Sequence, residues 1–503
     1  GLLCVLLACG AARGTPPFLG ESSEDYLKAS AIDDLGNIWV VGWTRSKNFP
    51  VSKNAWQQEK RHEGNEIFLS KYSPSGQLLY STFLGGDVKE EAHSIVVDRS
   101  GNLWVAGYTT SKGFPITENA FQKNLKGKAD VFVAKISFDG KLLYSTFLGG
   151  DGLDTAGPIV IDKSGNIWIS GSTTSKNFPV TEDAFQTGMK GNEDAFVSKF
   201  SPSGELLYST FFGGRENSNG WDSAHASSVD GAGNIWISGS TTSENFPVTA
   251  DAWQKKYGGG KIMGNGDAFV SKFSSTGELL YSTYLGGKGW DSTNAMTVDG
   301  VGNVWIAGTT VSETFPVTKN AWQKKHGGNG FADVFLAKFS PWGNLLYATL
   351  LGGRGDDGGH AITVDKKGNI WVTGRAFSGD FPVKNAWQKK TGGLNDVFVS
   401  KFSSSGELLY STFLGGGGQD FTNTIVIDEE ENVWVSGIAG SGFPITKDAW
   451  QKIMKGENDA FVSKLSSTGD ELLYSTYLGG EASSPTPGPA PTPGFSAHDV
   501  LGG

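Results

Sequence analysis

Apolar and polar residues alternate in short runs along the whole chain, and turns that contain glycine separate these runs. In residues 93–148 the alternation, with its β-branched and aromatic residues, predicts four strands at 93–98, 103–109, 131–137 and 142–148. Residues 99–102 and Gly140 mark turns between strands. No stretch shows a long helical period of apolar positions, so the sequence predicts an all-β protein.

The same four-strand pattern occurs seven times. Its anchor is Gly-Asn-(Ile/Leu/Val)-Trp, although the seventh copy has Glu431 in place of the glycine. A Phe-Pro pair and a tyrosine in the fourth strand recur equally often. The repeat of about 66 residues has room for one four-stranded sheet. The anchor tryptophans are Trp39, Trp104, Trp168, Trp236, Trp305, Trp371 and Trp434.

Four-stranded sheets bury both faces by stacking on one another, and closing the stack into a ring protects their edges. The sequence therefore predicts a seven-bladed β-propeller of four-stranded antiparallel blades. The anchor tryptophan is expected between neighbouring blades, where its large ring is removed from water. Two arrangements stay open: each repeat forms one blade, or the two termini share a blade, with residues 18–20 as the end of an additional strand.

Charge and cysteine content narrow the classes of function. The chain of 503 residues contains 72 glycines, has 19% charged residues and carries a net charge of −10. It lacks the basic surface that binds phosphate backbones, so no nucleic-acid partner is expected. Both cysteines, Cys4 and Cys9, precede the repeats, which can therefore form neither a disulfide nor a thiolate metal site.

The two ends of the chain differ from the repeats. The apolar run 2–12 is too short to span a bilayer and is interpreted as part of an export signal. Residues 6–10, LLACG, resemble the lipobox of bacterial lipoproteins, which implies lipid attachment at Cys9; a plain signal peptide is the alternative. The predicted divisions are a signal remnant (1–14), the propeller (15–480) and a proline-rich linker with a short tail (481–503).

Several runs resemble the SBBP-type β-propeller repeat of bacteria. They are LLYSTFLGG at 78–86, IVVD at 95–98, GNLW at 101–104 and FP at 114–115, with counterparts in all seven copies over residues 18–480. The hairpin of the first two strands also resembles that of NHL-type propellers. These resemblances imply the fold and an exported bacterial protein. Together with the lipobox-like run at 6–10, they predict a protein of the bacterial cell envelope with a lipid anchor to a membrane surface. They imply no defined activity, because fold alone does not determine function.

Residues that depart from the repeat pattern are the first candidates for a ligand-binding site. Packing explains the residues that recur in every repeat, but it does not explain the residues that differ. Two loops between repeats carry an extra tryptophan beside an acid, and the loop after the second strand of the fourth repeat is longer. An exposed aromatic ring beside a carboxylate suits a carbohydrate or protein ligand. The alternative is that the tryptophans fold back over neighbouring blades. The candidate ligand-binding residues are Trp221, Asp222, Trp290, Asp291 and Tyr257.

A second candidate lies near the start of the first strand of each repeat. If this strand is innermost, as the NHL resemblance implies, one equivalent position points toward the channel mouth on the face with the long loops. The residues there are Lys28, His93, His225, Asn294, His360 and Asn423, and Gly157 in the third repeat. His93, His225 and His360 could converge on a metal ion or an anion, although polar residues at a hydrated mouth need no ligand.

The sequence contains no recognised catalytic motif, so no cofactor is expected. The favoured interpretation is a non-catalytic, monomeric binding or scaffolding protein that recognises its ligand through the long-loop face. One alternative is a metal-dependent lyase or hydrolase with the three histidines as ligands. Another is a purely structural envelope component, for which Trp221 and Trp290 are expected to be buried.

Overall fold

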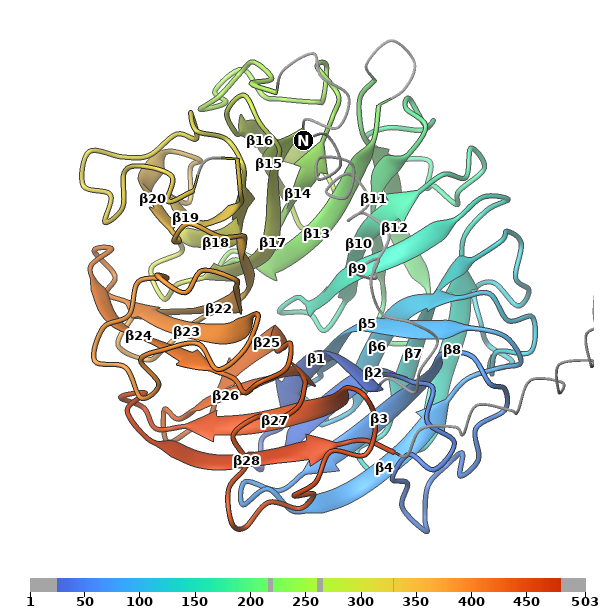
Figure 1. Cartoon of the computed structure of the whole chain (residues 1–503). Coiled ribbons are helices and arrows are strands. Elements are labelled where there is room, and N and C mark those ends of the chain that lie inside the picture. The colour runs from blue at the N-terminus through green and yellow to red at the C-terminus, as the bar shows by residue number, and fades with distance from the viewer. Residues whose placement is uncertain (1–24, 216–219, 260–265, 329, 481–503) are drawn as a thin grey trace, which may run out of the picture.

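Seven four-stranded antiparallel sheets surround a central axis in the computed structural model (Figure 1). The structure describes residues 25–215, 220–259, 266–328 and 330–480. This part of the chain contains no helix, and therefore none that could cross a membrane. The predicted all-β, seven-bladed propeller is confirmed. The predicted signal at 1–14 with Cys9, and the predicted tail at 481–503, lie outside the described residues and stay predictions.

Each blade consists of four consecutive strands, ordered from the axis to the rim. The first three blades are formed by β1 (Asp25–Ile32), β2 (Ile38–Thr44), β3 (Glu66–Tyr72) and β4 (Leu78–Leu84); β5 (Glu90–Val97), β6 (Leu103–Thr109), β7 (Asp130–Ile136) and β8 (Leu142–Leu148); and β9 (Asp154–Ile161), β10 (Ile167–Thr173), β11 (Asp194–Phe200) and β12 (Leu206–Phe212). The fourth and fifth are formed by β13 (Asp222–Val229), β14 (Ile235–Thr241), β15 (Asp267–Phe273) and β16 (Leu279–Leu285); and β17 (Asp291–Val298), β18 (Val304–Thr310), β19 (Asp333–Phe339) and β20 (Leu345–Leu351). The last two are formed by β21 (Asp357–Val364), β22 (Ile370–Ala376), β23 (Asp396–Phe402) and β24 (Leu408–Leu414); and β25 (Phe421–Ile427), β26 (Val433–Ala439), β27 (Asp459–Leu465) and β28 (Leu472–Leu478).

The inner strand of the second blade begins earlier than its sequence pattern predicts. The alternation predicts a start at residue 93, whereas β5 begins at Glu90. The pairing register shifts between Ala92 and Ser94, as in a β-bulge. A bulge breaks the two-residue period, so the alternation is visible only after it.

An aspartate closes the hairpin between the first two strands of the blade. Asp98 Oδ1 accepts the N–H groups of Ser100 and Asn102 at 2.9 Å each, and Gly101 takes a φ of 77° that glycine allows without strain. Lys135 Nζ lies 3.3 Å from Asp98 Oδ2 and 5.0 Å from the ring centroid of Trp104. This aspartate thus has a structural role in the hairpin.

Aromatic side chains fill the seams between blades. Trp104 is fully buried and packs with Ile159 and Ile167 of the third blade. Toward the rim, the Tyr144 hydroxyl donates to the carbonyl of Gly204 at 2.7 Å in the next blade. Gly204 has a φ of 93°, and a Cβ there would overlap the tyrosine ring. The same tyrosine-over-glycine contact forms at all seven seams.

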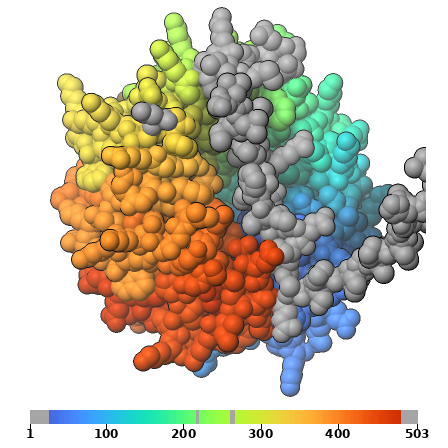
Figure 2. Space-filling view, in the orientation of Figure 1, coloured from blue at the N-terminus to red at the C-terminus, as the bar shows by residue number. Residues whose placement is uncertain are grey.

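The ring closes through side chains, and each repeat forms one complete blade. Tyr474 donates to the carbonyl of Gly76 at 2.7 Å, and Asn423 Nδ2 donates to the carbonyl of Leu27 at 2.7 Å. The blue first blade thus lies beside the red last blade (Figure 1), and the yellow, orange and red blades pack directly against one another (Figure 2). The open question of blade boundaries is settled for the described strands.

We expect Tyr474→Ala to lower the free energy of unfolding by about 3–5 kcal/mol, because it leaves a cavity at the closing seam. Tyr474→Phe keeps the ring but removes the hydrogen bond to the carbonyl of Gly76 and the one accepted from the N–H of Trp450. It is expected to cost about 1–3 kcal/mol. Urea unfolding followed by tryptophan fluorescence measures both, with Tyr208→Ala at an interior seam as the matched control. A Tyr474→Ala protein as stable as the wild type would show that this seam does not hold the ring closed.

Candidate functional site

The inner strands β1, β5, β9, β13, β17, β21 and β25 face the axis, and they begin on the face with the long loops (Figure 1). We call the long-loop end of these seven strands the mouth. The six residues predicted at the channel mouth occupy one equivalent position there, and all are half-buried. Their predicted role at the channel mouth stays a prediction.

Five of these six side chains bind the next blade. His93 Nδ1 contacts the carbonyl of Ala156 at 2.7 Å, and His360 Nδ1 contacts that of Thr422 at 2.9 Å. His225, Asn294 and Asn423 make the equivalent bonds to the inner strands of the blades that follow them. Lys28 differs, because its ammonium forms no hydrogen bond or ion pair with the described residues.

The three histidines do not assemble into a metal site. His93, His225 and His360 lie on alternate blades, and each holds a main-chain carbonyl of its neighbour through Nδ1. Within the described ranges, no three His, Cys, Asp or Glu side chains are placed so that they could hold one metal ion. The ligand set of the predicted metal-dependent alternative is therefore absent from this part of the chain.

The two candidate tryptophans lie in equivalent loops but differ in exposure. The Trp221 side chain is 49% exposed, whereas Trp290 is half-buried. The main chain of Trp221 is fixed to Thr242 by two hydrogen bonds of 3.0 Å. The main chain of Trp221 is thus held in place, and the residue is not the buried one that a purely structural role predicts.

The acids beside these tryptophans do not share their exposure. Asp222 and Asp291 are fully buried at the start of β13 and β17. Asp222 accepts hydrogen bonds from Gly214 N at 2.8 Å, from Ser243 Oγ at 2.9 Å and from the Thr241 hydroxyl. The predicted pairing of an exposed ring with an exposed carboxylate is wrong for this reason: the carboxylates turn inward and tie the loops to the blade.

The burial of this acid could have been recognised from its recurrence. Every blade carries an acid at this position, and a group that recurs in every repeat serves the shared frame. The seven residues are Asp25, Glu90, Asp154, Asp222, Asp291, Asp357 and Asp420. Burial raises the pKa of Asp25, Asp222, Asp357 and Asp420 to about 7, and that of Asp154 and Asp291 to about 6. The hydrogen bonds that these carboxylates accept from hydroxyl and main-chain N–H groups lower the pKa, but they do not outweigh burial.

The Tyr257 ring packs against the fourth blade. It packs edge-on against Tyr284, with ring centroids 5.9 Å apart, beside the cluster that contains Phe246. The side chain is half-buried. The predicted ligand-binding role of Tyr257 gains no support from this placement, because its ring is used in packing.

The blades differ most in a pair of residues that the sequence analysis did not identify. The first member is the residue that follows the buried acid on the inner strand. The second member is the residue that pairs with the first member on the second strand. The seven pairs are Tyr26–Trp43, Glu91–Tyr108, Thr155–Ser172, Ser223–Ser240, Ser292–Thr309, Gly358–Arg375 and Phe421–Ile438. A position-by-position comparison of the repeats would have revealed them, since each pair lies beside an invariant glycine of the second strand.

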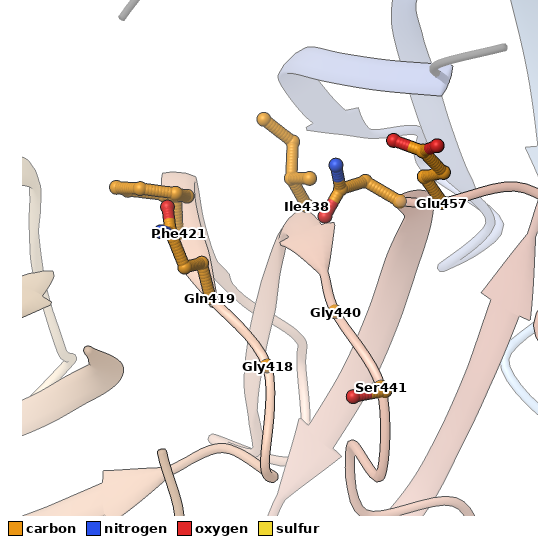
Figure 3. Close-up of a pocket in the computed structure, with 8 residues that line it drawn as sticks. Gly418, Gln419, Phe421, Ile438, Gly440, Ser441 and Glu457 are labelled. Atoms are coloured by element: carbon orange, nitrogen blue, oxygen red, sulfur yellow. The ribbon is translucent and has the colours of Figure 1, made fainter. Parts of the chain in front are cut away.

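These mouth pairs divide the mouth into sectors of different chemistry. The last and first blades are apolar: Tyr26 stacks on Trp43 with ring centroids 4.2 Å apart, and both pack with Ile438. A pocket of about 230 Å³ lies in the last blade, bordered by Gln419, Phe421 and Ile438 among others (Figure 3). The third, fourth and fifth blades carry hydroxyl residues at these positions, half-buried at Thr155, Ser223 and Ser240 and buried in the fifth blade.

The second blade contributes a charged sector. Buried Glu91 accepts a hydrogen bond from Asn65 Nδ2 at 2.8 Å and pairs with Lys89 Nζ at 3.0 Å. Burial by itself would raise the pKa of Glu91. The hydrogen bond and charge of His93, together with the charges of Lys89 and Lys28, outweigh burial and lower the pKa of Glu91 to about 2. Glu91 is thus an anion at neutral pH, and the neighbouring groups balance its negative charge.

Comparison with known proteins identifies the repeat. The model of the SBBP β-propeller repeat matches residues 81–115 and 346–382. Together with the seven blades of the structure, this match confirms that the chain carries SBBP-type repeats.

Two curated proteins are similar over most of the chain at low identity. The regulatory protein FlaEY of Caulobacter vibrioides is 24% identical over 348 residues, which is 67% of this chain and 35% of that protein. An uncharacterized WD repeat-containing protein of Acanthamoeba polyphaga mimivirus is 22% identical over 413 residues, 74% of this chain and 26% of that protein. The chain thus corresponds to about a third and a quarter of the lengths of these relatives.

Some solved structures are similar at low sequence identity. A polysaccharide lyase described as an ulvan lyase has 12% sequence identity and a TM-score of 0.44, with 92% of this chain and 96% of that chain covered. A gluconolactonase of Xanthomonas campestris has 11% identity and a TM-score of 0.34, with 69% and 83% covered.

We expect the thermal unfolding midpoint to fall as the pH rises from 5 to 8. The pKa of Asp222 is about 7 in the folded protein against 3.8 for an unperturbed aspartate, and Asp25, Asp357 and Asp420 behave alike. The folded state therefore binds more protons in this window, and the stability that protonation confers is lost as the pH passes 7.

Asp222→Asn imitates the protonated acid, because its amide can donate to the Thr241 hydroxyl. We expect the pH dependence of the midpoint to be shallower in this variant, and unchanged in Asp34→Asn, whose carboxyl group is exposed. Scanning calorimetry at several pH values measures both. A midpoint that rises with pH over this window would contradict the assignment.

Proposed function

We propose that this propeller is a non-catalytic recognition protein that binds a carbohydrate on its long-loop face, over the mouth. The observation that carries the proposal is the location of the differences between blades. The seam tyrosines, the hairpin aspartates and the buried acids recur in all seven blades, whereas the mouth pairs change from blade to blade. Residues that vary within a constant frame are free to serve a ligand.

The chemistry of one side of the mouth favours a polyhydroxylated ligand. Thr155, Ser223 and Ser240 are half-buried, and hydroxyl groups both donate and accept hydrogen bonds. Trp221, on the loop that leads into the fourth blade, adds an exposed ring with an N–H group. An apolar ring beside several hydroxyl groups complements the faces and edges of a sugar. A protein ligand remains an outcome of the test.

We expect an array of glycans and matrix proteins to show glycan hits with the full chain. Trp221→Ala is expected to weaken those hits at least about tenfold, the usual loss when a central tryptophan is truncated at a binding surface. The control is Trp342→Ala. Trp342 is 78% exposed in a third-to-fourth-strand turn, and the turns within the hairpins lie on the opposite face from the long loops.

Three outcomes contradict the proposal. Hits that require Trp342 would place the site on the other face. Hits confined to proteins would replace the carbohydrate as ligand. A blank array would leave the long-loop face without a ligand of either class.

A further inference from the structure

A groove of about 500 Å³ lies between the fourth and fifth blades, on the face opposite the long loops. We call this the turn face, because the hairpin turns within each blade lie there. The groove is bordered by the β13–β14 turn with Gly231, the β17–β18 turn with Val301 and the β19–β20 turn with Trp342. Val301 and Trp342 are 79% and 78% exposed, so an apolar surface faces solvent here.

The groove is open because two glycines replace charged residues. Gly231 and Gly300 follow the hairpin aspartates of the fourth and fifth blades, and a Cβ at either glycine would meet nothing within 4 Å. Two adjacent blades thus lack a charged side chain that the rest of the turn face carries. The residues at this position in the other five blades are Asp34, Arg99, Lys163, Lys366 and Glu429.

Trp342 is a second departure from the repeat. In the other six blades the residue before the glycine of this turn has a short polar side chain, which hydrogen-bonds to the serine that begins the turn. Ser203 does so to Ser201 at 2.8 Å, for example. Trp342 exposes an indole ring instead. Six blades form the same turn without this ring, so packing does not require it, and its presence indicates contact with a ligand.

The floor of the groove is fixed and its charges are paired. Lys272 Nζ lies 2.9 Å from Asp230 Oδ2 and donates to the carbonyl of Pro341 at 3.1 Å, which ties the fourth blade to the fifth. The Asp299 carboxylate accepts hydrogen bonds from its own blade. Among the side chains that line the groove, the indole N–H of Trp342 is the polar group that has no hydrogen bond to the described residues.

These features favour a proline-rich peptide over a carbohydrate. A sugar is held by several side-chain donors and acceptors, whereas this groove offers one free side-chain donor. Proline has no N–H, so a proline-rich segment brings few donors that need acceptors, and its carbonyl groups can accept from the indole N–H. Its rings pack on aromatic side chains, and grooves lined by aromatic residues recognise such segments in this way.

The chain itself contains a segment of this kind. Residues 483–494, SSPTPGPAPTPG, include five prolines and no charged residue. The segment begins three residues after Gly480, whose N–H is held by Asp25 at the long-loop end of the first blade. Three residues span at most about 11 Å, whereas a strand of seven residues, such as β28, separates the two faces by about 20 Å. The whole segment therefore cannot lie in the groove of its own chain.

We propose that this groove binds the proline-rich segment 483–494 of a second copy of the chain. The proline rings pack on Trp342, and a carbonyl group of the segment accepts from the indole N–H. Segment and groove are different surfaces, so the contact is heterologous and can join copies in a row. It lies on the face opposite the proposed carbohydrate surface and does not depend on the proposed function.

The first test uses the full chain labelled with 5-fluorotryptophan and a large excess of a synthetic peptide of residues 483–494. The Trp342 signal in the fluorine-19 NMR spectrum is assigned from its absence in Trp342→Phe. We expect the peptide to shift this signal, and a peptide with alanine in place of all five prolines to leave it unchanged. No shift with the proline peptide, or an equal shift with both peptides, would overturn the inference.

A variant that fills the groove locates the effect. Gly300→Lys introduces the side chain that the sixth blade carries at this position, in a place where a Cβ meets nothing, and we expect it to abolish the shift. The matched control is Gly188→Lys, at a long-loop glycine with the same free space, which is expected to keep the shift. A shift that survives Gly300→Lys would place the peptide outside the groove.

The second test measures the average mass of the full chain by sedimentation at rising concentration. We expect the mass to rise above that of one chain, and Trp342→Ala to need at least about tenfold higher concentration for the same rise. Trp221→Ala, on the other face, is expected to associate like the wild type. We expect the same loss of association when the prolines of the segment are changed together: Pro485→Ala, Pro487→Ala, Pro489→Ala, Pro491→Ala and Pro493→Ala.

The outcomes of the second test decide the source of the segment. Association that persists in both the Trp342→Ala chain and the proline-free chain would show that another surface joins the copies. Peptide binding at Trp342 without any association would overturn the second copy as the source. Neither result bears on the proposed function, which Trp221→Ala tests on the glycan array.

Discussion

The contact between each tyrosine and the glycine turn of the following blade is the interaction on which the ring depends. It places an aromatic ring over a backbone that no larger residue could occupy, as Tyr474 does over Gly76. The anchor tryptophan fills the same seam nearer the axis, where Trp434 packs with Leu27 and Val40 of the first blade. Because no strand is shared between the described blades, side-chain packing and a few hydrogen bonds, such as that from Asn423 Nδ2 to the carbonyl of Leu27, join the first repeat to the last.

A rigid frame of this kind leaves the loop ends of the inner strands free to vary. The buried acids fix where each inner strand begins, since Asp222 ties the loop, the second strand and its own strand together. The next residue along the chain is then held in place whatever its identity. The mouth therefore carries an apolar sector, a charged sector and a hydroxyl sector on one geometry, which is how a propeller can acquire a binding site without changing its fold.

The sequence by itself determined the all-β class, the number of blades and the ring of polar residues at the mouth, because these follow from period and recurrence. It placed His93, His225 and His360 at one equivalent position but could not show that each holds a carbonyl of the next blade. It also paired Trp221 with Asp222 as neighbours in the chain. Only the tertiary structure decided that the ring faces solvent while the carboxylate is buried, because adjacent residues of a strand point in opposite directions and the neighbouring blades determine which direction is inside.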